Sequence, residues 1–181
     1  KGEMLALQWS DIDFENSTVS VTKAAAVVDG KQVCKAPKTK NSRREVSIPR
    51  FLTDRLHSMM VEQTKTKESL GAYWKGNNWL FTQSDGSMMS YSTPYATFQD
   101  AIDRYNANKE PSDQLPHIPF HGLRHTSATL LIAAHQDVRT VSNRLGHAQA
   151  STTMNIYAHA LKENDRTASN ALENMLCKTG A

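Results

Sequence analysis

The spacing of apolar and polar residues along the chain predicts mainly helices. Over residues 51–67, apolar positions recur every three or four residues, which is the pattern of an amphipathic helix. Comparable segments predict further helices over residues 93–106, 120–134, 138–145, 151–159 and 161–176. Residues 1–7 consist of helix formers with no capping residue ahead of them, so we expect them to be the end of a helix that begins upstream.

Strand signals gather in the first third of the chain. Residues 18–22 alternate β-branched and small polar side chains, and Asp29-Gly30 is a hairpin-type turn. Two more strands are expected over residues 32–35 and 45–48. We predict that these three strands form a small three-stranded antiparallel sheet near the N-terminus, within an α+β fold that is mostly α-helical.

Length and cysteine content indicate an ordinary globular domain. A chain of 181 residues can bury a core without disulfides, and we expect a single domain over residues 1–181. Cys34 and Cys177 match neither a disulfide framework nor a metal-ligand spacing, so we expect no metal and no cofactor. The sequence has no apolar run of membrane-spanning length and no signal-peptide pattern, so we expect a cytoplasmic protein without a membrane partner.

The net charge of +3 conceals an uneven distribution. Residues 31–55 carry eight basic and two acidic side chains, a local net charge of +6, whereas the other 156 residues carry 13 basic and 16 acidic groups, a net charge of −3. A basic patch on a slightly acidic protein is typical of a protein that binds the phosphate backbone of nucleic acid. Charge alone leaves a solvated basic hairpin as an equal alternative.

The predicted helix over residues 120–134 has two different faces. A helical wheel places an apolar set on one side, which we expect to face the core: Phe120, Leu123, Leu130, Leu131 and Ala134. The other side presents His121, Arg124 and His125 together with Ala128. The two histidines are four residues apart, but Gly122 stands where a zinc-protease helix needs a glutamate, so we do not expect a metal site.

Three segments in order carry a family resemblance. They are GEMLALQWSDID at Gly2 to Asp13, HGLRHTSATLL at His121 to Leu131, and RLGHAQASTTMNIYAH at Arg144 to His159. In the third, a Leu-Gly-His sequence places His147 ten residues before Tyr157. With this order and spacing, the chain resembles the catalytic domain of the tyrosine recombinase (phage integrase) family, and most of all the integrases of phages and conjugative transposons.

The resemblance implies roles for individual residues. Tyr157 would attack the scissile DNA phosphate and form a 3′-phosphotyrosine link. Arg124 would hold the non-bridging oxygens, with His121 and His147 also at the phosphate, and Lys38 would protonate the leaving 5′-oxygen. Lys40 competes with Lys38 for that role. Supporting positions are Glu3, which matches the acidic residue of the first motif, and His125, and the basic residues expected at DNA are Lys35, Lys40, Arg43 and Arg44.

Elementary chemistry asks for these residue types independently of the resemblance. A phosphodiester gathers negative charge on its non-bridging oxygens during displacement, and a planar guanidinium suits that charge. A phenol is a poor nucleophile at neutral pH and needs a base, which His121 or His147 can supply. A lysine whose pKa is lowered by neighbouring cations can donate a proton to the leaving alkoxide.

The resemblance also implies what lies around this chain. The first catalytic arginine of the family would fall immediately before Lys1, so we expect a fragment without the upstream core-binding domain that binds DNA weakly and cleaves it poorly. We expect the chain to bind double-stranded DNA attachment sites, with accessory DNA-bending proteins as further partners. On paired sites we expect a homotetramer, and without DNA a monomer or weak oligomer. We expect residues 161–181 to form a tail helix that either packs on its own core or docks into a neighbouring protomer.

Two other functions fit the same residues. A type IB topoisomerase uses the same nicking and closing chemistry as a monomer without pairing sites. A DNA-binding module would keep the basic hairpin and lack catalysis, although His121, Arg124, His147 and Tyr157 are all present in the sequence.

Overall fold

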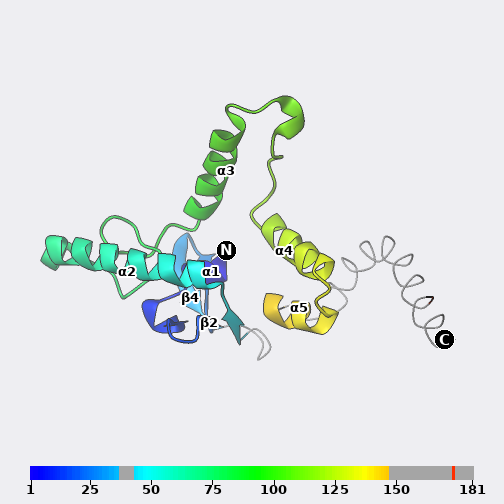
Figure 1. Cartoon of the computed structure of the whole chain (residues 1–181). Helices are drawn as coiled ribbons and strands as arrows, with labels where there is room; N and C mark the ends of the chain where they lie inside the picture. Colours follow the sequence, from blue (N-terminus) through cyan, green and yellow to red (C-terminus); the bar gives the residue numbers. More distant parts are fainter. Residues whose placement is uncertain (37–42, 147–172, 174–181) are drawn as a thin grey trace. The chain divides into compact units, whose positions relative to one another are not determined.

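The computed structural model describes residues 1–36, 43–146 and 173, and the chain divides into two compact units, Lys1–His121 and Gly122–Ala181 (Figure 1). In chain order, the described elements of the first unit are α1 (Gly2–Leu5), the 3-10 turn η1 (Trp9–Asp11), β1 (Ile12–Asp13), β2 (Thr18–Val21), β3 (Ala24–Val28), β4 (Lys31–Lys35), β5 (Arg44–Ser47), α2 (Arg50–Leu70), the 3-10 turn η3 (Gly71–Tyr73), α3 (Thr93–Asn106) and the 3-10 turn η4 (Pro111–Asp113). The described elements of the second unit include α4 (Gly122–Ala133) and α5 (Val138–Leu145). The predicted single domain over residues 1–181 stays a prediction.

The strands of the first unit form two separate antiparallel sheets. A three-stranded sheet has the order β1-β2-β5, with Val19 of β2 opposite Ile12 on one side and Val46 on the other. The predicted fold class is therefore confirmed, but the predicted membership of the sheet is wrong. The strand over residues 31–35 belongs to a two-stranded sheet with β3, and β1 takes its place in the three-stranded sheet.

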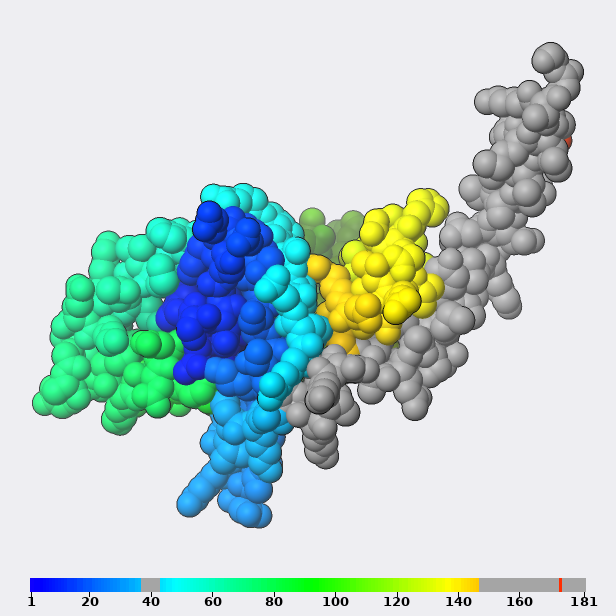
Figure 2. Space-filling model, turned by 90° about the horizontal axis from the view of Figure 1, so that it is seen from below, coloured from blue at the N-terminus to red at the C-terminus, as the bar shows by residue number. Residues whose placement is uncertain are grey.

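Turn geometry explains this difference. Asp29 and Gly30 both have positive φ, 50° and 72°, which is the backbone of a tight hairpin turn. The turn folds β4 directly back on the residues before it, so that Val28 lies opposite Lys31 and Ala24 opposite Lys35. The apolar run of β3 lacks the alternation that marks a strand in sequence. Figure 2 shows this hairpin, in lighter blue, projecting from the first unit.

The main core of the first unit lies between the three-stranded sheet and α2. The buried side chains come from β1, β2, α2 and the segment after η3, and they are Ile12, Val19, Val21, Leu56 and Leu80. A second cluster packs α1 against the β3–β4 hairpin through Leu5, Ala6 and Ala25. The predicted helix over residues 51–67 is confirmed and is longer, because Pro49 precedes it and Gly71, with φ 52°, ends it.

Helix α3 supports the polypeptide that leads to His121. Its range, Thr93–Asn106, matches the predicted helix, and Pro94 lies in its first turn. The following segment returns along α3: Gln99 donates a hydrogen bond to the Ile118 carbonyl (3.0 Å), and the ring of Phe120 packs edge-on against Phe98 with centroids 5.9 Å apart.

The second unit contains a pair of helices that pack on each other. Ala128 and Ile132 of α4 meet Val141 and Leu145 of α5, and all four side chains are buried. The start of α5 is capped by Asp137, whose carboxylate accepts a hydrogen bond from the Thr140 backbone N–H (2.9 Å). Both helices confirm the predictions for residues 120–134 and 138–145. The helices predicted over residues 151–159 and 161–176 lie outside the described residues, except for residue 173.

The expected orientation of α4 is wrong in part. Ala128, from the side that the wheel assigned to chemistry, is fully buried, while Leu123 and Leu130 of the expected core side are 38% and 65% exposed. As expected, His125 is exposed and Leu131 packs against the helix pair. The helical wheel grouped the small Ala128 with the polar residues. In the structure α5 packs against α4 at Ala128, because a small side chain lets two helices come close. Arg124 therefore lies one turn before the packed residue Ala128, and not opposite the core.

Candidate active site and nucleic-acid interface

Glu3 and Arg44 meet although 41 residues separate them in the sequence. Arg44 Nη1 donates to Glu3 Oε1 at 3.0 Å and Nη2 donates to Oε2 at 2.8 Å, which makes a two-pronged ion pair. The Arg44 side chain is 14% exposed and that of Glu3 is 36% exposed. This geometry matches the fork of the guanidinium to both carboxylate oxygens, the strongest form of such a pair.

The first turn of α1 is held tightly against the β3–β4 hairpin. A Cβ atom built on Gly2 would lie only 2.5 Å from the carbonyl oxygen of Ala25, so only glycine fits this close approach. The ammonium of Lys1 lies 4.1 Å from the centroid of the Tyr91 ring, a cation–π contact. The beginning of the chain is thus packed on both sides within the first unit.

The basic residues of the first unit fall into different environments. Lys35, at the end of β4, and Arg43, just before β5, are exposed. The guanidinium of Arg44 is paired with the Glu3 carboxylate, and its predicted contact with DNA stays a prediction. Lys38 and Lys40 lie outside the described residues. The structure thus describes the strands on both sides of the segment that carries the candidate general acid, at Lys35 and Arg44.

His121 is the last residue of the first unit and is exposed. It directly follows Phe120, which is fixed on α3 by its edge-on contact with Phe98. In the second unit, Arg124 is partly buried on α4 and His125 is exposed. His121 and Arg124 belong to different units, and their predicted roles at one phosphate stay predictions.

His147 follows directly after a well-defined helix end. Helix α5 ends at Gly146, which has φ 69° and ψ 38°, and the Gly146 N–H donates to the carbonyl of Asn143. Hydrogen bonds from the side chain and backbone N–H of Thr140 lower the pKa of Asp137 at the other end of the helix. His147 and Tyr157 themselves lie outside the described residues, so their predicted roles stay predictions.

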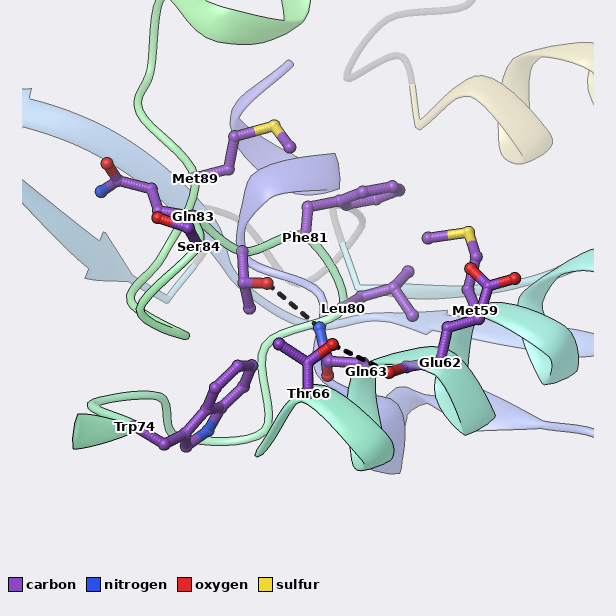
Figure 3. Close-up of a pocket in the computed structure, with 11 residues that line it drawn as sticks. Met59, Glu62, Gln63, Thr66, Trp74, Leu80, Phe81, Gln83, Ser84 and Met89 are labelled. Carbon is purple, nitrogen blue, oxygen red and sulfur yellow. Dashed lines mark hydrogen bonds between the residues drawn. The ribbon is translucent and has the colours of Figure 1, made fainter. Parts of the chain in front are cut away.

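A cavity of about 260 Å³ lies elsewhere in the first unit, between α2 and the segment over residues 74–89. Gln63, drawn in Figure 3 among the lining residues, donates a hydrogen bond to the Thr82 hydroxyl (3.2 Å) and accepts one from the Trp9 indole (2.6 Å). Of the candidate catalytic residues that the structure describes, neither His121 nor Arg124 lines this cavity. Its polar groups hold α2 to its neighbours and do not extend the predicted site.

Sequence reasoning singled out Glu3 and Arg44 but missed that they pair. It assigned Glu3 a supporting role and Arg44 a contact with DNA. No periodicity connects two residues that belong to a short helix and a strand 41 positions apart, and a pair that depends on tertiary packing leaves no local signal. The charge pattern identified the basic region and could not sort its members.

The described elements are helices and small antiparallel sheets, as the sequence predicted. The chain matches the sequence model of the phage integrase family over residues 1–164. It is 33% identical over 175 residues to the ICEBs1 integrase of Bacillus subtilis, covering 97% of this chain and 45% of that protein. It is 31% identical over 187 residues to a XerC-like tyrosine recombinase of Caldanaerobacter subterraneus subsp. tengcongensis, covering 97% and 46%.

Solved structures show the same fold. The Tn1549 transposon integrase in complex with circular intermediate DNA superposes with a TM-score of 0.76, at 23% identity over 94% of this chain and 55% of that one. The chain belongs to the phage integrase family.

It spans about half the length of the curated relatives it matches. No helix in the described part of the chain is long and apolar enough to cross a membrane.

Proposed function

We propose that this chain is the catalytic part of a tyrosine site-specific recombinase that cuts and rejoins double-stranded DNA at attachment sites. The observation that carries the proposal is the family match over residues 1–164, which contains the complete candidate set. That set comprises Lys38, His121, Arg124, His147 and Tyr157. The basic strands of the first unit support it, because exposed Lys35 and Arg43 stand on either side of Lys38 in sequence.

The reaction is a transfer of a phosphoryl group between two oxygens. The Tyr157 Oη forms a bond to the scissile phosphorus while the bond from phosphorus to the 5′-oxygen breaks. The phenolic proton passes to His121 or His147, and the Lys38 ammonium gives a proton to the departing 5′-oxygen. Arg124 balances the charge that develops on the non-bridging oxygens. Because the phosphodiester energy is kept in the tyrosine link, rejoining to another 5′-hydroxyl needs no cofactor and no metal.

Strand exchange between two sites requires more than one subunit. We propose a tetramer on paired sites, with residues 161–181 as the segment that docks between neighbours, and accessory proteins that bend the DNA. The Tn1549 integrase and the XerH recombinase were both solved bound to DNA, which supports DNA as the partner here. Removing residues 162–181 should leave DNA binding intact and abolish coordinated strand exchange.

Trapping the covalent intermediate tests the enzymatic proposal. The chain is extended upstream of Lys1 so that it includes the first-arginine position, and is incubated with a pool of short nicked duplexes with randomised arms. After cleavage the short fragment beyond the nick diffuses away, so the tyrosine link cannot be reversed. We expect a protein–DNA adduct that survives SDS, in a yield that Tyr157→Phe reduces to background.

Tyr105→Phe is the matched control. Tyr105 is 49% exposed on α3 and lies under the Lys109 ammonium, so removing its hydroxyl should leave the adduct unchanged. The absence of an adduct from the extended wild-type chain would contradict the proposal and favour a DNA-binding module without catalysis. Relaxation of supercoiled plasmid by monomers, without paired sites, would favour a topoisomerase.

A further inference from the structure

We propose that His117 is a positioning residue: as an imidazolium it bridges Gln99 and Asp103 of α3 and holds the returning segment, residues 114–120, against that helix. The returning segment ends directly before His121, a candidate catalytic histidine. The bridge follows from contacts within the first unit. Its effect on DNA cleavage rests on the function proposed above.

Helix α3 presents three polar side chains to the returning segment. Gln99, Asp103 and Asn106 are spaced by four and three residues, so they lie along one face of the helix. The Asn106 side chain donates to the Leu115 carbonyl (2.9 Å) and accepts from the Leu115 N–H (2.8 Å). Gln99 donates to the Ile118 carbonyl (3.0 Å). Two amide side chains of α3 therefore hold the backbone of the segment at two points.

The ring of His117 lies between the other acceptors of this face. Its Nδ1 contacts the side-chain oxygen of Gln99, and its Nε2 lies 3.1 Å from Asp103 Oδ1. The Gln99 amide cannot turn its NH2 toward the ring, because that group donates to the Ile118 carbonyl. Both ring nitrogens therefore face oxygen acceptors. A histidine ring carries an N–H at both positions only in its charged form.

Loss of one proton from the ring removes one of its two bonds. A neutral ring keeps one N–H, and its other nitrogen then directs a lone pair at the oxygen of Gln99 or Asp103. Histidine is the side chain that ordinarily changes its charge between about pH 5 and 8. Since the closed segment binds the charged ring, it is held most firmly at the acidic end of this range and loosens as the pH rises.

The charge that faces the ring comes from α3. Asp103 is the acid that the ring contacts, and the side chains of His117 and Asp103 are 54% and 61% exposed. Because water reaches this pair, we expect several-fold effects and not larger ones. Asp100 and Arg104 stand on the same helix, about 100° further round it. The charged residues between α3 and the ring along the chain are Lys109, Glu110 and Asp113.

Closure of the segment affects the candidate site through its last residues. Phe120 packs edge-on against Phe98 of α3, and His121 follows it directly. A catalytic histidine acts only within hydrogen-bond reach of the proton that it transfers, and a displacement of about 1 Å can cost on the order of 100-fold in rate. A bridge at His117 therefore limits how far His121 moves from α3.

Hydrogen exchange at the Leu115 amide measures closure, because this N–H donates to Asn106 and exchanges when the segment leaves α3. The chain is extended upstream of Lys1, and rates are corrected for the intrinsic effect of pH on exchange. We expect protection to be about 3- to 10-fold higher at about pH 5.5 than at about pH 8. His117→Phe keeps a ring without either N–H, and at both pH values it should resemble the wild type at the higher pH.

Two other variants separate the charge of the ring from other causes. Asp103→Asn keeps an acceptor oxygen beside Nε2 but removes the negative charge, so the difference between the two pH values should fall below about 2-fold. His57→Phe is the matched control. His57 lies on α2 in the same unit, edge-on against Phe14, and its loss should leave the pH dependence at Leu115 unchanged.

Two results of the exchange measurement would overturn the bridge. One is equal protection of the wild type at both pH values. The other is a pH dependence that persists in His117→Phe, since it would then belong to a different group.

The rate of formation of the Tyr157 adduct tests the effect on the proposed function. Wild type and His117→Phe are compared at the same pH, because their ratio cancels the titration of the other catalytic groups. The wild type should be about 3- to 10-fold faster at about pH 5.5 and less than about 2-fold faster at about pH 8. His57→Phe should match the wild type at both.

Failure of the inference and failure of the proposed function give different results. Equal rates of wild type and His117→Phe at both pH values would overturn the positioning role of His117 and leave the proposed function intact. No adduct from the wild-type chain would contradict the proposed function, and exchange at Leu115 would still decide whether the bridge exists.

Discussion

The two units hold their candidate residues in place by different means. In the first unit, Glu3 and Arg44 meet across 41 residues through α1, whose Leu5 is fully buried. In the second, Arg124 lies on α4, which packs against α5, the next helix along the chain. The placement of Arg44 therefore depends on the folding of a whole unit through distant contacts, while that of Arg124 depends on a local helix pair.

Removing one buried aliphatic side chain from each unit is the strongest way to test this difference. Leu5 and Ile132 are 0% and 2% exposed, and replacement of either by alanine should cost about 3 kcal/mol of unfolding free energy. Native-state hydrogen exchange resolved by segment measures the loss. Leu5→Ala should lower protection throughout residues 1–121 and Ile132→Ala only in α4 and α5.

The same experiment can contradict the comparison. If Leu5→Ala also lowered protection in α4 and α5 by the same amount, the units would unfold as one, and the distinction between distant and local placement would fail. If it affected α1 alone, the first unit would not be cooperative, and Arg44 would not depend on its packing.

The sequence predicted the local elements well for a physical reason. Helices α3 and α5 have the expected bounds because Pro94, Asp137 and Gly146 are start and stop signals that act within one turn. Which strands share a sheet and which face of α4 is buried depend on the elements that pack against them in the folded chain. The spacing of apolar residues does not specify those neighbours. Leu130 illustrates the point: its position on the wheel is apolar, yet it is 65% exposed.

The candidate site divides in the same way. Short, local motifs in a fixed order made His121, Arg124, His147 and Tyr157 candidates, and their roles stay predictions. The pairing of Arg44 with Glu3 could not be predicted, since charge counts treat all cations of residues 31–55 alike. Only tertiary structure distinguishes a guanidinium held by a carboxylate from an exposed cation such as Arg43.

The N-terminal cap of α5 tests whether local contacts stabilise the second unit, with a smaller expected effect than the loss of a buried side chain. Asp137→Ala removes the acceptor for the Thr140 N–H, and we expect the melting midpoint of the second unit to fall by a few degrees while the first unit is unchanged. Asp137→Asn keeps an acceptor oxygen at the same place and should lose much less. Circular dichroism for the whole chain and hydrogen exchange for each unit provide the measurements.

The same carboxylate predicts a dependence on pH. Its pKa is lower in the folded chain than the ordinary value of 3.8, because the folded state stabilises the charged form. The stabilisation is therefore complete above that value and disappears as the pH falls through the lower folded-state pKa. The difference in stability between wild type and Asp137→Asn should shrink across that acidic range, and a constant difference would show that the charge contributes nothing.

The smallest effect is expected from an ion pair that lacks the features of Glu3–Arg44. Arg50 and Asp54 lie four residues apart on α2 with side chains 72% and 65% exposed, joined by one contact of 3.4 Å. Water and salt screen such a pair, so Asp54→Asn should change the unfolding free energy by no more than about 0.5 kcal/mol, and by less at 1 M salt. Both changes can be measured by urea titration. Glu3→Gln should lower the unfolding free energy by more than Asp54→Asn, and this loss should depend less on salt, because the Arg44 side chain is 14% exposed and bonded to both carboxylate oxygens. Equal losses from the two substitutions would mean that the link between α1 and β5 is an ordinary surface contact.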